Sequence, residues 1–97
     1  MFVWHKNYMK EKALSRVRSI WGNKNEFERY TVFLEHEWDY SGRFRICLKL
    51  SDNPDHPQGL SHFTFCKEGE HLGEKLDFDK LPEDIQEHII SRINQWE

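Results

Sequence analysis

Two carboxylates and an imidazole occur close together in the stretch Asp52-Asn53-Pro54-Asp55-His56. Asp52, Asp55 and His56 are residue types that together could hold a divalent cation and activate water for hydrolysis. Asp, Asn and Pro are also the residues that turns use, because their side chains and dihedral preferences suit chain reversals. The stretch therefore predicts a loop first and a metal-dependent hydrolase site second.

The other histidines and cysteines do not have the spacing of metal ligands. His56, His62, Cys66 and His71 fall within sixteen residues, but no pair forms a CxxC or HxxxH motif. Nucleophile elbows, glycine-rich phosphate loops and HExxH are also missing. We therefore predict no catalytic residue, no metal and no cofactor. The missing motifs favour a non-enzymatic protein, and whether the chain is an enzyme stays open. Cys47 and Cys66 could form one disulfide, but a lone pair without an export signal predicts two free thiols.

The charge is unevenly distributed along the 97 residues, although the net charge is only −3. Residues 1–25 carry six basic side chains against one acidic, a net charge of +5, whereas residues 26–97 carry eight against sixteen, a net charge of −8. The acidic body favours a protein partner, and the basic end makes nucleic acid the alternative. The sequence contains no apolar run of about 18 residues, the length needed to span a bilayer. We therefore expect a cytoplasmic protein without a membrane partner.

The residues that could bind a partner lie mostly on a predicted β-sheet. Residues 26–50 are predicted to form the central hairpin of that sheet. Apolar residues alternate along both arms, as in half-buried strands; they are Tyr30, Val32, Leu34, Phe44, Ile46, Leu48 and Leu50. A turn at Tyr40-Ser41-Gly42 would close the hairpin, because glycine accepts positive φ without steric cost. That turn would place Trp38 opposite Phe44, Leu34 opposite Leu48 and Glu37 opposite Arg45.

Two helices and further strands complete the predicted fold. Apolar residues at three- and four-residue steps predict a helix over residues 8–21, and Pro82 begins a second amphipathic helix that reaches about Trp96. Residues 60–67 alternate as a third strand, and residues 75–78 as a short fourth. We therefore expect one α+β domain over residues 1–97, with the order α-β-β-β-(β)-α: an antiparallel three- to four-stranded meander with both helices packed on one face.

The alternation separates a buried face from an open one. The predicted inward residues are Leu14, Val17, Trp21, Tyr30, Val32, Leu34, Phe44, Ile46, Leu48, Phe63, Phe65, Ile85, Ile89 and Ile93. The opposite face would be wet, and its charged residues would ordinarily form cross-strand ion pairs. As a binding platform it would offer Arg29, Phe33, Arg43, Arg45, Lys49 and His62.

The predicted order of helix, three antiparallel strands and helix resembles the layout of the double-stranded-RNA-binding domain. That resemblance implies RNA binding, but the lysine-rich start of the family's last helix is here the acidic Leu81-Pro82-Glu83-Asp84. We assign no family. We expect a small, acidic, non-enzymatic protein-interaction module of the adaptor or inhibitor type, with homodimerisation open. Nucleic-acid binding is the alternative, and the hydrolase at Asp52, Asp55 and His56 is the second alternative.

Overall fold

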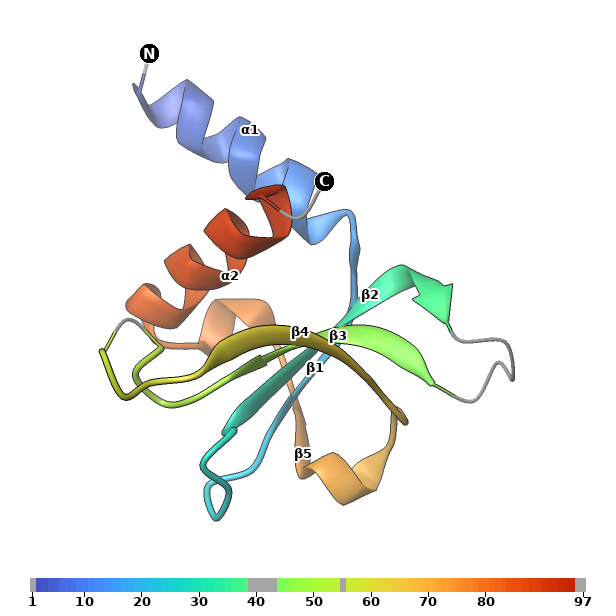
Figure 1. The fold of residues 1–97 in the computed structure, drawn as a ribbon. Coiled ribbons are helices and arrows are strands. Elements are labelled where there is room, and N and C mark those ends of the chain that lie inside the picture. The colour runs from blue at the N-terminus through green and yellow to red at the C-terminus, as the bar shows by residue number, and fades with distance from the viewer. Residues whose placement is uncertain (1, 39–43, 55, 96–97) are drawn as a thin grey trace.

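The computed structural model describes residues 2–38, 44–54 and 56–95, and the side chains of residues 7–35, 44–54 and 56–95. Figure 1 shows an α+β fold. Along the chain, one helix precedes the strands of an antiparallel sheet and a second helix follows them. The elements are α1 (Phe2–Leu14), β1 (Val17–Gly22), β2 (Tyr30–Trp38), β3 (Arg45–Leu50), β4 (Ser61–Cys66), the 3-10 turn η1 (Glu70–Leu72), β5 (Glu74–Leu76), the 3-10 turn η2 (Phe78–Lys80) and α2 (Glu83–Gln95).

The sheet has the strand order β4-β3-β2-β1-β5, and every neighbouring pair is antiparallel. Strands β1 to β4 follow one another as a meander, and β5 returns to pair with β1 at the other edge. The connection from β4 to β5 passes η1 on the side of the sheet opposite the two helices (Figure 1). The predicted fold class is confirmed, with a fifth strand added to the expected meander.

The predicted helix over residues 8–21 is wrong in its second half. Helix α1 ends at Leu14, and Val17–Gly22 is strand β1, which pairs with β2 on one side and β5 on the other. A register shift between Val17 and Ser19 places one extra residue in β1. Val17 and Ile20 therefore both pack at the core although they are three residues apart, a spacing that also fits a helix.

The predicted hairpin forms, but its register differs from the predicted one. Leu48 pairs with Val32 and not with Leu34, an offset of two residues. After an irregularity between Phe33 and Trp38, Arg45 pairs with Trp38 and not with Glu37, an offset of one residue. A shift of two residues preserves the side of the sheet on which each side chain lies, because successive strand residues alternate. The inward assignment of Val32, Leu34 and Leu48 is accordingly confirmed. The predicted turn at residues 40–42 lies outside the described residues.

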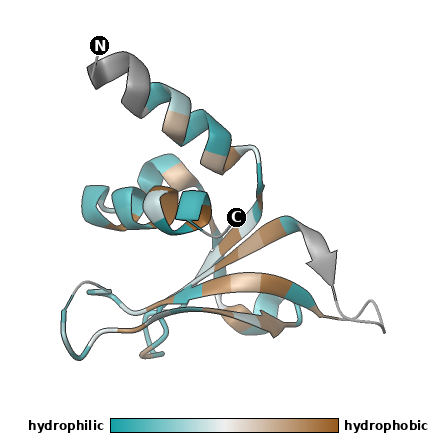
Figure 2. Cartoon of the chain, turned by 45° about the horizontal axis from the view of Figure 1, so that its top comes forward, coloured by the Kyte–Doolittle hydropathy of each residue, from teal (hydrophilic) through white to brown (hydrophobic). Residues whose placement is uncertain are grey.

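The core lies between the sheet and α2. Its buried members are Ala13, Ile20, Tyr30, Val32, Leu34, Ile46, Leu48, Leu50, Leu81, Ile85, Ile89 and Ile93. Figure 2 shows the apolar residues concentrated along the strands. Helix α1 lies on the same side of the sheet and contacts α2, where Asn94 Nδ2 donates a hydrogen bond to the carbonyl of Met9 over 3.1 Å.

Three residues predicted as part of the buried core are not members of it. Trp21 is half-buried and donates a hydrogen bond from Nε1 to Ser19 Oγ over 2.9 Å. Phe44 and Phe65 are 39% and 50% exposed. Trp21 lies on the face away from α2, because it pairs with Thr31 while its neighbour Ile20 pairs with the core residue Val32. Phe65 pairs with the core residue Ile46 and so shares its face, but it lies outside the core and remains open to solvent.

Candidate functional site

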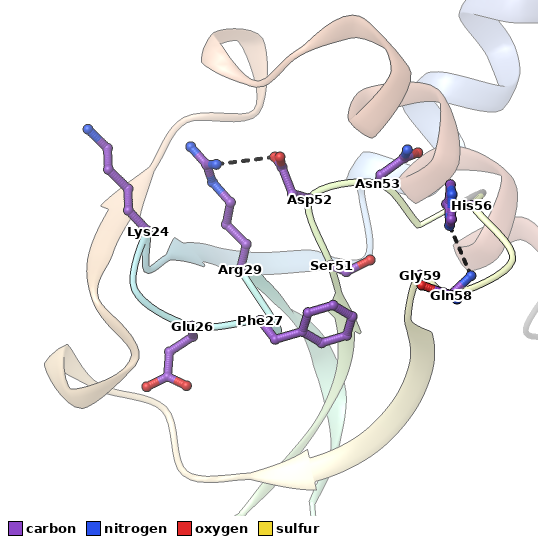
Figure 3. A pocket seen from close by; sticks show the side chains of 10 residues that line it. All are labelled: Lys24, Glu26, Phe27, Arg29, Ser51, Asp52, Asn53, His56, Gln58 and Gly59. Atoms are coloured by element: carbon purple, nitrogen blue, oxygen red, sulfur yellow. Dashed lines mark hydrogen bonds and ion pairs between the residues drawn. The ribbon is translucent and has the colours of Figure 1, made fainter.

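The loop over residues 51–59 and the turn before β2 enclose a hollow of about 390 Å³ at one end of the sheet (Figure 3). Three sequence candidates line it, namely Arg29, Asp52 and His56. Arg29 Nη1 donates to Asp52 Oδ1 over 3.2 Å, and the Gln58 N–H donates to His56 Nδ1 over 3.0 Å. Both contacts fix the loop, and they occupy an oxygen and a nitrogen that a metal would use.

Asp55 of the predicted hydrolase site lies outside the described residues. Within the described part of the chain, no group of three His, Cys, Asp or Glu side chains is arranged to hold a metal ion. The hollow also contains a residue that the sequence did not indicate: Phe27, whose ring is 64% exposed. Its place in a polar turn gave no periodicity from which its role could be predicted.

The predicted binding platform on the far side of the sheet is partly covered. Glu68, in the connection from β4 to β5, accepts hydrogen bonds from Arg18 Nε over 2.8 Å and from Ser19 Oγ. Arg45 Nε also lies 3.9 Å from Glu68 Oε1. These contacts hold the connection from β4 to β5 against β1 and β3. The connection therefore covers part of the sheet face opposite the helices.

Phe33, predicted as an exposed anchor, is fully buried, as is its pairing partner Cys47. Neither belongs to the core under α2, so the far face has an apolar centre of its own. Lys49 is half-buried beside Thr31 and Leu72. His62 remains partly exposed, with Nε2 2.7 Å from Glu28 Oε2. Arg43 lies outside the described residues.

The electrostatics of Glu68 reflect this position. Partial burial alone would raise its pKa, but hydrogen bonds from Ser19 and Arg18, with the charges of Arg18 and Arg45, outweigh burial and lower the pKa. The carboxylate is therefore ionised under ordinary conditions and holds the connection in place. Sequence reasoning missed Glu68 because it stands in a glycine-containing segment predicted only as a turn.

β4 and β5 are the two edge strands of the sheet. In the described residues, no strand pairs with the outer edge of β4. Phe65 in β4 pairs with Ile46, and Phe44 lies two residues before Ile46, directly ahead of β3. Phe44 and Phe65 are thus diagonal neighbours within reach of one another. Phe65, predicted as a core residue, forms part of an exposed aromatic surface.

These features define a small α+β domain in which, over the residues that the structure describes, the outer edge of β4 is unpaired. In comparisons with known proteins, no family model matches the sequence, and no curated protein or solved structure matches it either. Among the described residues, no helix has the length and apolar character needed to cross a membrane. The function is therefore argued from the surfaces of the fold.

Proposed function

We propose that the chain is a protein-interaction module that binds an extended segment of a partner protein along the outer edge of β4. An added strand forms main-chain hydrogen bonds with the edge, and its alternate side chains contact the neighbouring surface. Every second residue of an antiparallel edge strand directs its N–H and C=O away from the sheet. The proposal includes the expectation that the protein acts in the cytoplasm.

The contrast between the two sheet edges carries this proposal. Strand β5 has three residues, and two of them are the charged Glu74 and Lys75. Short length and charge are features that protect an edge from pairing with other chains. Strand β4 has six residues without Asp, Glu, Lys, Arg or Pro, and it pairs with β3 without a register shift. It thus lacks the features that protect β5.

Two phenylalanines supply a place for partner side chains. Phe65 and Phe44 lie beside the edge and are 50% and 39% exposed. Burial of apolar surface contributes roughly 25 cal/mol per Å², so an apolar partner residue laid against Phe65 would add to the main-chain hydrogen bonds. Aromatic side chains at the centre of an interface often carry most of the binding energy.

The described surfaces give less support to the nucleic-acid alternative. Lys10 lies 3.9 Å from Asp79, Arg18 is bonded to Glu68, and Arg29 is bonded to Asp52. Phosphate binding requires basic groups that cluster on one face, whereas these three are distributed over separate regions and each has an acidic neighbour. We therefore place the binding site at β4.

A display library of random linear peptides, selected on the wild-type protein, tests the proposal. We expect peptides with alternating apolar residues, and we expect their binding to shift the backbone amide resonances of β4. Phe65→Lys should abolish binding, because a lysine at an edge disfavours strand addition. Phe27→Lys is the matched control, since Phe27 is also an exposed phenylalanine but lies in the hollow of Figure 3.

Two results would overturn this assignment. Peptides whose resonance shifts map to the hollow around Phe27, and which bind Phe65→Lys normally, would place the site elsewhere. A concentration-dependent dimer of the wild type, abolished by Phe65→Lys in sedimentation experiments, would show that the β4 edge serves a second copy of this chain instead of another protein.

A further inference from the structure

Two thiols meet on the far face of the sheet, and the proposed function gives neither thiol a role. Cys47 of β3 pairs with Thr64, and Cys66 of β4 pairs with Arg45, so the two cysteines are diagonal neighbours on adjacent strands. Their Sγ atoms lie 3.1 Å apart, and both thiols are free. A disulfide has an S–S distance of about 2.05 Å, so the sulfurs need to approach by only about 1 Å.

The two thiols differ in accessibility. Cys47 is completely buried between β2 and β4, whereas Cys66 is half-buried on the edge strand. A reagent in solution can therefore reach Cys66 but not Cys47. This arrangement provides one attacking thiol and one resolving thiol.

The two thiols also differ in ionisation. The pKa of Cys66 is lowered to about 7, first by the hydrogen bond from Cys47 and then by the charge of Lys49, which together outweigh burial, Glu28 and Glu68. The pKa of Cys47 is raised, first by its hydrogen bond to Cys66 and then by burial and the negative charge of Cys66. The first proton of the pair is therefore lost from Cys66, the thiol that solvent reaches.

We propose that Cys66 and Cys47 form a thiol–disulfide exchange site, in which Cys66 attacks a small disulfide and Cys47 resolves the adduct into an intramolecular disulfide. Such dithiols in cytosolic proteins are oxidised transiently. The substrate class is a low-molecular-weight disulfide such as oxidised glutathione.

The reaction proceeds in two exchanges. The Cys66 thiolate attacks one sulfur of oxidised glutathione, the glutathione S–S bond breaks, and one glutathione thiolate leaves. Cys47 then loses its proton and attacks Cys66 Sγ, and the second glutathione leaves as a thiolate that takes up a proton. Overall, the two protein thiols are oxidised to one disulfide, and one oxidised glutathione is reduced to two glutathione molecules.

The adduct itself prepares the second exchange. Once Cys66 is bound to glutathione it has no negative charge and no longer accepts a strong hydrogen bond from Cys47. Two of the causes that raise the pKa of Cys47 are then removed, and its thiolate forms more readily. The 3.1 Å separation places its sulfur next to the atom that it attacks.

Mass spectrometry of the intact reduced protein after exposure to oxidised glutathione tests the site. The wild type should lose two hydrogens without retaining glutathione. Cys47→Ala should retain one glutathione, and Cys66→Ser should react with none. Circular dichroism of each variant confirms that it is folded before the reaction.

A second measurement distinguishes this site from two unrelated thiols. The rate at which oxidised glutathione reacts with the folded protein should reach half its maximum at a pH of about 7. In Cys47→Ala that midpoint should move upward, because the hydrogen bond that lowers the pKa of Cys66 is gone. A wild type that keeps both thiols, a stable glutathione adduct on the wild type, or an unchanged midpoint would each overturn the proposal.

Discussion

Arg18 and Glu68 are 50 residues apart in the sequence, yet Arg18 Nε donates a hydrogen bond to Glu68 Oε1 over 2.8 Å. Ser19, the next residue of β1, donates to the other oxygen of the same carboxylate. One side chain thus joins β1 to the segment that follows β4 at the opposite edge of the sheet. Because this contact fixes the connection across the far face, it determines which residues of that face a partner can reach.

The contacts of Glu68 predict that the free energy of unfolding decreases at acid pH. The folded-state pKa of Glu68 lies below its ordinary value of 4.5. The contribution is therefore complete above about pH 4.5 and is lost as the pH falls through the lower, folded-state value. Glu68→Gln should lower the free energy of unfolding at neutral pH by about 1 kcal/mol, a value reduced by the partial exposure of Arg18.

Urea unfolding at several pH values measures this contribution. Between neutral pH and pH values below about 4.5, the wild type should lose more stability than Glu68→Gln does. Glu70→Gln is the matched control, because Glu70 is an exposed carboxylate in the same connection, and it should retain the wild-type profile. Parallel curves for wild type and Glu68→Gln would contradict the role given to Glu68.

The sequence was sufficient for the hairpin and its inward face, because alternation depends on local geometry alone. Val32, Leu34 and Leu48 could be assigned to the core even though the register differed by two residues. The start of β1 could not be predicted in the same way. The extra residue between Val17 and Ser19 puts Val17 and Ile20 on one face at a helical spacing, and only pairing with β2 and β5 shows that the segment is a strand.

The candidate site was harder to predict than the fold, because it depends on contacts between distant segments. Alternation correctly placed Phe33 and Cys47 on the face away from the helices, but it gave no indication that the connection after β4 would cross that face. Which strand forms an edge depends on the spatial order of the strands in the sheet. The order of the strands along the chain does not determine that spatial order. Phe65 was therefore predicted as core although half of it is exposed.

The burial of Phe33 predicts that the far face contributes to stability. Phe33→Ala should lower the free energy of unfolding by about 3–5 kcal/mol, since it removes a fully buried ring and leaves a cavity. Phe27→Ala should change it by less than about 0.5 kcal/mol, because that ring is 64% exposed. Urea denaturation of both variants gives the comparison. Equal losses in the two variants would show that Phe33 is not covered as described.

Gly73 is predicted to be intolerant of any side chain. Its φ of 111° is rarely adopted by other residues, and a Cβ atom there would lie 2.1 Å from the carbonyl oxygen of Gly22 in β1. Gly73→Ala should therefore destabilise the protein by more than about 2 kcal/mol and weaken the pairing of β5 with β1. Thermal unfolding measures the loss. Glu74→Ala, an exposed change at the next residue, should have little effect and serves as the control.

Oxidation of Cys47 and Cys66 should make the protein more stable against unfolding. The two cysteines are 19 residues apart, and closing a loop of about that length restricts the unfolded chain by roughly 3 kcal/mol. Urea unfolding of the oxidised wild type should therefore require a higher midpoint concentration than that of the reduced protein. Cys66→Ser, exposed to the same oxidant, should unfold at one midpoint under both conditions, because it has no second thiol. If the oxidised protein were less stable than the reduced one, the disulfide would have to distort the pairing of β3 and β4, and the arrangement of the two thiols would not suit exchange.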